Sequence, residues 1–407
     1  MNPVTALDVF AGVGWGVACE WLGVREYGVE IAKSAIRLRT ANGMRTIYRD
    51  VWSGLSHEHL VPEHDLYIAS PPCQTFSMAG KGEGRKALDD VLDAIAADLY
   101  RHPADLERLE DRVDPRTALV LTPLAHIFRH RPRLVALEQV PEVLPVWHAY
   151  AAVLRSFGYS VWTGIMRAEQ YGVPQTRKRA ILMARLDGKV QPPAPTHSRY
   201  YYTDSGRLDP GVEKWVSMAE ALGFGLASRP SPTITGGGTE TGGAEPIAKL
   251  ARYTESDDWV LRSQYGAGGD PNERGERPVH HPASTITSKA GSMKWFIGNQ
   301  RPGGGNFYQE RSTNHPAPTI TSVANKGGLS NEPRVSSLEG LQRLTHLEAA
   351  ALQSFPRDIV WPGNQGEKFL AIGNAVPPLM AAAILGALLA RPAERDAWDN
   401  VFAAVAG

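Results

Sequence analysis

The sequence predicts an α/β protein in which a doubly wound, mostly parallel sheet carries an inserted, smaller, loop-rich β domain. Three observations support this prediction. The chain opens with a strand, a glycine-rich turn and a helix, and strands then alternate with helices to about residue 187. From residue 188 to about 335 the composition shifts to Gly, Pro, Ser and Thr. Helical periodicity returns only after that stretch.

Five apolar runs predict the strands of the first domain, at 4–10, 25–30, 65–70, 133–140 and 177–186. Helices are predicted between them, at 117–131, at 146–158 and after the glycine turn, with apolar Val17, Ala18, Trp21 and Leu22. Residues 84–113 are charged but place Leu88, Val91, Leu92, Ile95 and Leu99 at helical spacing. This pattern favours an amphipathic helical insertion with a docked apolar face over a catalytic segment.

The inserted region repeats a Pro-x-x-Thr-Ile-Thr pattern at 229–238, 281–291 and 315–328. Each copy predicts a short strand after a proline-set turn, followed by a polar loop, and the unequal spacing of the copies argues against a solenoid. Helical patterns at 338–355 and 367–390 then end the chain, and the second is apolar on most faces. We therefore expect three parts: an α/β domain at 1–187, an insertion at 188–335, and a segment at 336–407 that returns to the first domain.

Composition limits the possible partners and compartment. Among 407 residues, 43 basic side chains balance 43 acidic ones, so a polyanion would have to be held by local patches. Cys19 lies in an apolar helical pattern and Cys73 in a loop, which argues against a disulfide framework and favours a reducing compartment. With no charged leader and no run of 18 apolar residues, we expect a soluble cytoplasmic protein without membrane contact.

Cys73 lies in the loop ASPPCQTFSMAGKG, directly after a predicted strand. Open α/β sheets bind their ligands at the carboxyl ends of strands, and two preceding prolines stiffen the approach to the thiol. A positioned nucleophile needs that stiffness, although a small buried hydrophobic residue remains the alternative. The loop alone names no target.

The turn DVFAGVGWG indicates a nucleotide or nucleoside site. Gly12, Gly14 and Gly16 let the backbone approach a ligand closely, and Glu30 at the next strand end can accept hydrogen bonds from ribose hydroxyls. Both NAD and S-adenosylmethionine proteins use this arrangement, and a turn without a cofactor is the third possibility. Asp50 suits an adenine edge or a helix cap equally well.

Two further stretches carry charged residues at strand ends. Glu138 ends the apolar run LVALEQV, where it is either a solvated acid or a buried carboxyl that hydrogen-bonds and protonates a ring nitrogen. Gln175, Arg177 and Arg179 alternate on entry to a strand and so share one side. The two guanidiniums there could hold a phosphate or a carbonyl oxygen, or could simply be exposed.

Taken in order, these stretches closely resemble the cytosine-5 DNA methyltransferase family. DVFAGVG resembles its cofactor motif, PPCQTFS its nucleophile loop, EQV its Glu-Asn-Val motif and QTRKR its Gln-x-Arg-x-Arg motif. LTHLEAAALQSFP and GNAVPP resemble its last two motifs, which a variable target-recognition domain separates from the rest. The resemblance covers about 1–187 and 336–385, and it implies a Rossmann-like, S-adenosylmethionine-dependent methyltransferase.

The resemblance implies a reaction and its residues. Cys73 would attack carbon 6 of a cytosine flipped out of duplex DNA, and carbon 5 would then take the methyl group from S-adenosylmethionine, leaving S-adenosylhomocysteine. Glu138 would support protonation of ring nitrogen 3. Gln175, Arg177 and Arg179 match the motif that orients the base, its phosphate and the nucleophile loop.

The family also implies the cofactor contacts, and it implies a monomer that needs no metal. Phe10, Gly12 and Gly14 would lie against S-adenosylmethionine, Glu30 on its ribose, and Asp50 and Val51 near its adenine. The remaining cofactor positions that match are Asp8, Ala11, Pro72, Leu119 and Asn374.

Two departures from the family pattern affect these expectations. The family usually has adjacent glycines where this chain has Gly14-Trp15-Gly16, which predicts a tighter loop with Trp15 covering the pocket. Gln139 replaces the customary Asn after the catalytic Glu and, being longer, leaves open how the nucleophile loop is positioned.

The insertion at 188–335 is expected to contact DNA, and its 16 basic and 14 acidic residues make it only slightly positive. The basic residues near the Thr-Ile-Thr loops are candidates for base and phosphate contacts: Lys289, Lys294, Arg301, Arg311 and Lys326. Three alternatives remain open: a transfer RNA cytosine-5 methyltransferase, an NAD-dependent oxidoreductase, and a catalytically inactive DNA-binding module. A role in restriction-modification is one expected context, and a solitary or a phage enzyme are the others. The recognition sequence cannot be read from the sequence.

Overall fold

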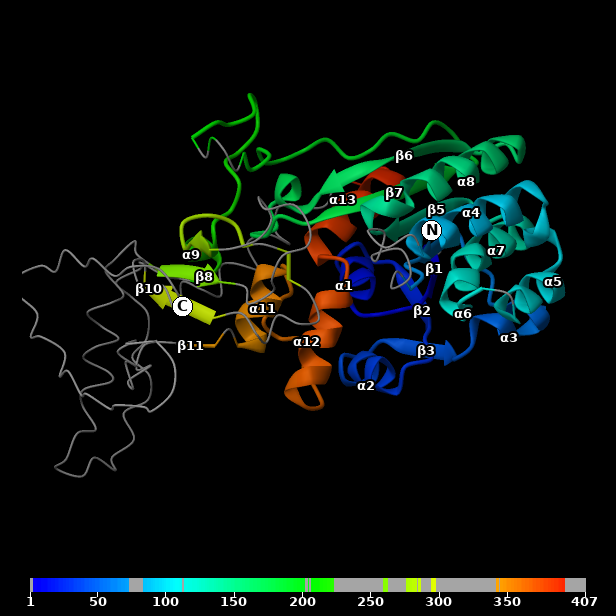
Figure 1. Ribbon diagram of the computed structural model, residues 1–407, viewed down its shortest axis with the longest axis horizontal. Helices are drawn as coiled ribbons and strands as arrows, with labels where there is room; N and C mark the ends of the chain where they lie inside the picture. Colours follow the sequence, from blue (N-terminus) through cyan, green and yellow to red (C-terminus); the bar gives the residue numbers. More distant parts are fainter. Residues whose placement is uncertain are drawn as a thin grey trace, which may run out of the picture.

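The computed structural model describes residues 3–72, 83–111, 113–201, 204, 206–222, 259–262, 276–283, 285–286, 294–297, 342–343 and 345–391. A seven-stranded sheet of order β3-β2-β1-β4-β5-β7-β6 dominates this part of the chain (Figure 1). The strands are β1 (Thr5–Val9), β2 (Arg25–Val29), β3 (Arg45–Tyr48), β4 (Leu66–Ala69), β5 (Leu134–Gln139), β6 (Ser160–Arg167) and β7 (Lys178–Arg185). The first five are parallel, and β7 runs antiparallel to both β5 and β6. The mostly parallel α/β sheet predicted from the sequence is therefore confirmed.

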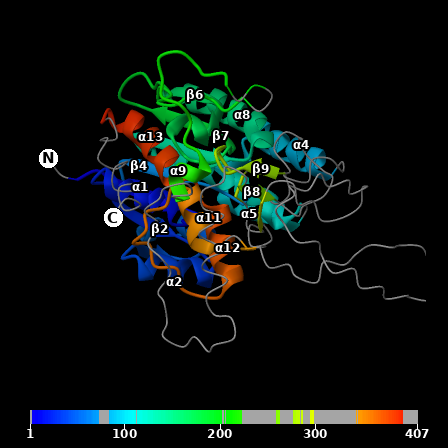
Figure 2. The same cartoon turned by 90° about the vertical axis from the view of Figure 1, so that its left-hand side faces the viewer.

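Helices cover both faces of the sheet. One face is covered by α3 (Val51–Ser56), α4 (Glu83–Ala96), α5 (Pro103–Glu107), α6 (Pro115–Ala118), α7 (Thr122–His130) and α8 (Leu144–Ser156). The other face is covered by α1 (Gly14–Trp21) and α13 (Pro378–Leu389). Figure 2 shows α1 and α13 on one side of the molecule and α4, α5 and α8 on the other. Helix α13, the last one in the described residues, thus packs beside α1, the first.

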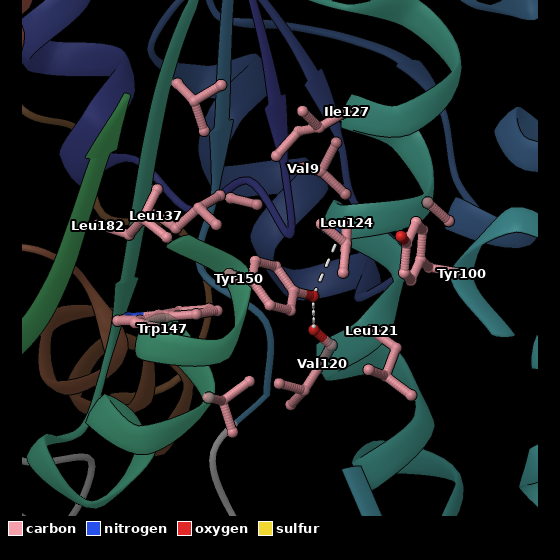
Figure 3. Close-up of a cluster of buried hydrophobic side chains, with 14 of the residues drawn as sticks. Val9, Tyr100, Val120, Leu121, Leu124, Ile127, Leu137, Trp147, Tyr150 and Leu182 are labelled. Atoms are coloured by element: carbon pink, nitrogen blue, oxygen red, sulfur yellow. Dashed lines mark hydrogen bonds between the residues drawn. The ribbon is translucent and has the colours of Figure 1, made fainter. Parts of the chain in front are cut away.

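Buried aromatic side chains on the face covered by α3 to α8 form hydrogen bonds with backbone groups (Figure 3). The indole of Trp147 donates to the carbonyl of Ala180 at 3.1 Å. The hydroxyl of Tyr150 donates to the carbonyl of Val120 and accepts from the amide of Leu124 at 3.3 Å. Because these polar atoms have partners, large rings can be fully buried between α8, the sheet and α7.

The tail of the chain forms α11 (His346–Leu352), α12 (Gln365–Asn374) and α13. By length and composition alone, Gln365–Leu389 is apolar enough to cross a membrane, but 78% of its most apolar window is buried inside the protein. The helix also breaks before α13, where Pro377 and Pro378 follow each other. Burial against α1 and the sheet accounts for this apolar composition.

A small antiparallel sheet of order β11-β10-β8-β9 accompanies the large one. Its strands are β8 (Trp259–Arg262), β9 (Glu276–Pro278), β10 (Lys294–Ile297) and β11 (Gln342–Arg343). In Figure 1, α11 and α12 lie between this sheet and the large one. The short α9 (Met218–Leu222) also belongs to the inserted region. The inserted β structure expected from composition is therefore present, with a last strand that follows residue 335.

Several elements differ from those predicted. The sequence patterns missed β3 and β6, which are the two edge strands of the large sheet and have mostly half-exposed residues. The predicted single insertion helix at 84–113 is α4 followed by short helical turns, although its apolar face is docked through Val91 and Ile95. An edge strand buries only part of its surface, so its apolar pattern is weak.

The Thr-Ile-Thr copy at 281–291 was predicted to form a strand, and this is wrong for its described part. Ala283 makes one isolated bridge with Gln175, and Ile286 lies outside any strand. The reason is that side chains take the place of a strand partner: the amide of Ile286 donates to Gln175 Oε1 at 2.7 Å, and Thr285 Oγ1 donates to the carbonyl of Thr176 at 2.7 Å. The copies at 229–238 and 315–328 lie outside the described residues.

Three histidines meet at the end of the sheet where β4 begins, away from the strand ends that carry the motifs. His64 Nε2 lies 3.1 Å from His126 Nε2, and the ring centroids of His126 and His130 are 4.3 Å apart. His64 Nδ1 donates to the carbonyl of Pro62 at 2.8 Å, which leaves its Nε2 to accept a hydrogen bond from His126 Nε2–H. Burial, the neighbouring histidines and Arg129 lower the pKa of His126 well below its usual value.

We predict that this cluster makes the protein less stable in mild acid. The lowered pKa values of His64, His126 and His130 mean that the unfolded chain binds more protons than the folded one once pH falls below about 6.5. The free energy of unfolding should therefore fall as pH drops from about 7 to about 5, and His126→Phe should flatten that decline. Urea titrations at several pH values measure the free energy of unfolding of both proteins. The carboxyl groups are the same in both, so a difference between the two pH profiles comes from the histidine cluster. Parallel profiles for the two proteins would contradict the prediction.

Candidate active site

The candidate residues follow the carboxyl ends of five neighbouring parallel strands. Phe10 follows β1, Glu30 follows β2, Asp50 lies just beyond β3, Pro72 lies just beyond β4, and Glu138 is near the end of β5. Parallel strands end at the same edge of a sheet, and β1 and β4, where the strand order reverses, are direct neighbours. The structure therefore places the glycine turn and the start of the Cys73 loop side by side.

The glycine turn has a constrained backbone. Phe10 adopts a positive φ of 61°, and the amide of Ala11 donates to the carbonyl of Val29 at 3.0 Å. A Cβ added to Gly12 would meet no atom within 4 Å, so open space lies in front of that residue. A Cβ on Gly14 would instead collide with the carbonyl of Val376. Gly14 is therefore needed for packing against the GNAVPP segment, which differs from the ligand contact expected of it.

Acidic side chains surround this turn. Glu30 Oε1 accepts from the amide of Ala32 at 2.7 Å, and burial raises the pKa of Glu30 above its usual value. Asp50 Oδ1 accepts from the amide of Trp52 at 3.1 Å and caps α3, which was one of the two roles expected for it. Asp8 lies deeper, within β1. Burial and the nearby Glu26 raise its pKa well above the usual range, and neither carboxyl oxygen has a partner among the described residues.

Glu138 and Arg179 form a close ion pair. Arg179 Nε lies 2.7 Å from Glu138 Oε1, and Glu138 is only 6% exposed. The pairing of β5 with β7 sets this contact, because Glu138 lies opposite Ile181 and Arg179 is its diagonal neighbour on the same face. Of the two interpretations offered by the sequence, the solvated strand-end acid is wrong, because Glu138 is buried and paired with Arg179. Its action on a ring nitrogen stays a prediction.

Gln175 and Arg177 do not join the Glu138–Arg179 pair and instead contact the inserted region and the last segment. Arg177 Nη1 donates to the carbonyl of Ile286 at 2.9 Å, and Nη2 donates to the carbonyls of Gly373 and Ala375 at 3.0 and 3.1 Å. Gln175 Nε2 donates to the carbonyl of Leu352 and to Gln353 Oε1 at 3.1 and 2.8 Å. Both side chains are fully or nearly fully buried. Of the expected pair of guanidiniums, Arg179 faces Glu138 and Arg177 joins the insertion to the last segment.

Cys73 lies outside the described residues, but the residues before it are well defined. Gln139 Nε2 donates to the carbonyl of Pro71 at 2.6 Å, so the longer side chain reaches the start of the nucleophile loop. Trp15 Nε1 donates to Ser70 Oγ at 3.0 Å from the opposite face of the sheet. Trp15 is buried in the core, so the expectation that it covers the cofactor pocket is wrong.

The remaining candidates frame the same edge. Val51 begins α3, and Leu119 is half-buried beside the core after α6. Asn374 ends α12 and is exposed, next to the Gly373 carbonyl that Arg177 binds. Of the basic residues proposed for DNA contact, Lys294 lies in β10, and Lys289, Arg301, Arg311 and Lys326 lie outside the described residues. The described part of the chain contains no group of three or more His, Cys, Asp or Glu side chains suited to a metal ion.

Sequence reasoning missed Arg39, which donates to the carbonyl of Gly12 at 2.8 Å and is fully buried. It also missed Ser70 as the partner of Trp15. Arg39 occurs in the polar-looking stretch AIRLRT, where nothing local distinguishes it from a solvated arginine. Its partner Glu26 is 13 residues away in sequence, and only the pairing of helix and sheet brings the two together.

The chain matches one protein-family model and several curated proteins. The family model "C-5 cytosine-specific DNA methylase" matches residues 4–101 and 108–390. The Type II methyltransferase M1.HphI of Haemophilus parahaemolyticus is 26% identical over 80% of this chain and 68% of its own length. The Type II methyltransferase M.AplI of Arthrospira platensis is 24% identical over 94% and 85%.

Solved structures show the same fold. The Entamoeba histolytica methyltransferase EhMeth has a TM-score of 0.52 at 14% identity, covering 96% of this chain and 99% of its own. The S. pombe Dnmt2 methyltransferase has a TM-score of 0.51 at 14% identity, covering 95% and 98%.

We predict that Arg177→Met lowers the free energy of unfolding by about 3 kcal/mol, because it removes a buried charged donor from three carbonyls. The matched control is Lys178→Met, which makes the same charge change one residue away on a half-exposed side chain and should cost no more than about 0.5 kcal/mol. Denaturant titration of both variants makes the comparison. Equal stabilities for the two would contradict a structural role for Arg177 and return it to the ligand-contacting role expected from the sequence.

Proposed function

The chain belongs to the C-5 cytosine-specific DNA methylase family, and from that premise we propose how its residues carry out the reaction. It is a DNA (cytosine-5-)-methyltransferase that takes its methyl group from S-adenosylmethionine. What remains to be assigned is the role of each side chain at the strand ends described above. The observation that carries our assignment is the Glu138–Arg179 pair beside a nucleophile loop whose first residues are held by Gln139 and Trp15.

The glycine turn fits S-adenosylmethionine. Open space in front of Gly12 admits a ligand, and the acids of Glu30 and Asp50 stand at successive strand ends, where ribose hydroxyls and an adenine amine would find acceptors. We assign Phe10, Ala11 and Gly12 to contact with the donor, with Val51, Leu119, Pro72 and Asn374 around it. Asp8 and Gly14 support the turn from within the fold, because Asp8 is buried in β1 and Gly14 packs on Val376. When bound, the donor supplies an electrophilic methyl group on its sulfonium.

We assign Cys73 as the nucleophile that attacks carbon 6 of the cytosine, as in the family. Glu138 hydrogen-bonds ring nitrogen 3 and gives it a proton, and Arg179 stabilises the carboxylate that this step leaves behind. Carbon 5 gains the methyl group and then loses its own proton to a base, after which the thiolate leaves carbon 6 and the C5–C6 double bond returns. Ring nitrogen 3 gives its proton back to the Glu138 carboxylate, which restores both the neutral base and the acid. The base must be flipped out because carbon 6 is inaccessible in a stacked duplex.

We further propose that the substrate is duplex DNA with a specific sequence, that residues 188–335 recognise it, and that the enzyme is a cytoplasmic monomer serving in restriction-modification. The Type II names of its relatives support the last point. The catalytic parts, 1–187 and 336–407, are joined through α1 and α13 and through Arg177, and this leaves the insertion as the variable part.

The first test uses labelled S-adenosylmethionine with duplex DNA or transfer RNA, and compares the natural protein with Cys73→Ser. We expect label on DNA only, with transfer lost in the serine variant because a hydroxyl is a far weaker nucleophile than a thiolate at neutral pH. Duplex DNA carrying 5-fluorocytosine at the target should leave a covalent adduct that survives denaturation, since fluorine at carbon 5 cannot be removed as a proton.

Cys19→Ser is the matched control, because it makes the same substitution at a cysteine that is fully buried in α1 and has no role in the proposed reaction. It should retain both transfer and trapping. Transfer to transfer RNA alone would overturn the DNA assignment, and undiminished transfer by Cys73→Ser would overturn the nucleophile assignment.

A second test concerns Gln139. Gln139→Leu removes the hydrogen bond to Pro71, and we expect kcat to fall by about three- to tenfold, the equivalent of one neutral hydrogen bond. Binding of S-adenosylmethionine, measured by calorimetry without DNA, should not change. Gln139→Asn should also slow transfer, because the shorter amide cannot span the same distance. A normal rate in both variants would show that Pro71 is positioned by other contacts.

A further inference from the structure

The guanidinium of Arg39 lies completely buried between α2 (Lys33–Ala41) and the sheet. Nη2 donates to both oxygens of Glu26 at 2.7 and 2.9 Å, and Nε donates to Thr46 Oγ1 at 3.1 Å. Nη1 is directed differently and donates to the carbonyl of Gly12 at 2.8 Å. Figure 1 shows α2 beside the end of the sheet formed by β2 and β3. One buried side chain thus connects that end of the sheet to the glycine turn.

The sheet is shaped to receive this guanidinium. A Cβ on Gly28, the fourth of the five residues of β2, would collide with the Arg39 guanidinium, so the missing side chain there provides the space. Glu26, two residues earlier on the same strand and with a side chain only 5% exposed, supplies the opposite charge. A buried charge without a partner is strongly unfavourable, so the arginine can be buried here only because Glu26 neutralises its charge.

The contact with Gly12 restrains a turn whose backbone conformation is unfavourable. Phe10 holds a positive φ of 61°, a conformation that non-glycine residues rarely adopt, and such a residue persists only where its surroundings fix it. Two hydrogen bonds from outside the turn fix this one: Ala11 N–H to the carbonyl of Val29, and Arg39 to the carbonyl of Gly12. Only the second is charge-assisted, which makes it the stronger of the two.

We propose that Arg39 is a positioning residue for the methyl donor: it holds the Gly12 carbonyl so that the turn has its binding conformation before the donor arrives. This inference rests on the assignment of the Phe10–Gly12 turn to S-adenosylmethionine. Arg39 touches neither donor nor base in this arrangement. Its removal therefore weakens donor binding and leaves the chemical step unchanged, because a preorganised site loses affinity when it must be ordered on binding.

The main variant combines Arg39→Met with Glu26→Leu, which replaces the buried pair with apolar side chains, so that neither member of the pair is left as a buried charge without the other. Calorimetry with S-adenosylmethionine in the absence of DNA should give a Kd about tenfold higher than that of the natural protein, the equivalent of one charge-assisted hydrogen bond. In steady state, KM for the donor should rise similarly while kcat stays within about twofold. A second variant, Gly28→Ala, displaces the guanidinium without deleting it and should shift Kd in the same direction.

Thr46→Val is the matched control, because it removes one of the Arg39 hydrogen bonds but keeps the one to Gly12. Thermal unfolding of every variant separates weakened binding from loss of fold. A Kd within about twofold of the natural value in both Arg39→Met/Glu26→Leu and Gly28→Ala would overturn the proposal. So would an equal loss of affinity in Thr46→Val, since the effect would then follow the stability of the network and not the Gly12 contact.

One more variant separates this inference from the assignment on which it rests. Gly12→Val places a side chain in the space in front of the turn, where a Cβ meets no atom within 4 Å. If the turn holds the donor, this variant should lose donor binding and keep its unfolding temperature. Normal binding by Gly12→Val would overturn the assignment of the turn, whereas loss of binding there combined with normal binding in the Arg39 variants would overturn only the role of Arg39.

Discussion

The buried guanidinium of Arg177 is the contact on which the assembly of this enzyme depends. It binds carbonyls of Ile286 from the insertion and of Gly373 and Ala375 from the last segment. These chain segments are distant in sequence, and each would otherwise leave buried carbonyl oxygens without a donor. Gln175 extends the same connection to Ile286 and to Gln353 near the end of α11. The motif that introduces β7 therefore joins three parts of the chain before it contributes Arg179 to the site.

In two buried acid–arginine pairs, the acid lies on a parallel strand of the large sheet. Glu26–Arg39 lies beside the glycine turn, and Glu138–Arg179 lies near the end of β5, where we propose that the cytosine binds. Buried ion pairs contribute little net stability, since the cost of desolvating two charges offsets their attraction. Their value here is geometric: each guanidinium pairs with its acid and also donates to a backbone carbonyl, that of Gly12 for Arg39 and that of Lys178 for Arg179.

Most of the fold and many of the site residues could be predicted from the sequence, and the exceptions share one cause. Buried strands such as β4 and β5 show continuous apolar runs, and the motifs at their ends follow from the geometry of parallel sheets. The edge strands β3 and β6 lack that signal. The partners of Arg39 and Arg177 could not be predicted because they are backbone carbonyls, which carry no residue-specific pattern and become acceptors only when distant segments pack. Gly14 was predicted to let the backbone approach a neighbouring group closely. The sequence could not show that this group is the Val376 carbonyl and not a ligand.

The departures from the family pattern compensate for each other around the nucleophile loop. Gln139 projects from the face of β5 that packs on α8, and it reaches the carbonyl of Pro71. Trp15 occupies the opposite face and binds Ser70, the residue before Pro71. The start of the loop is thus held from both sides of the sheet by side chains longer than those of the family pattern. Two hydrogen bonds and two consecutive prolines therefore leave residues 70–72 few backbone conformations. Cys73, which we propose as the nucleophile, directly follows this restrained segment in the sequence.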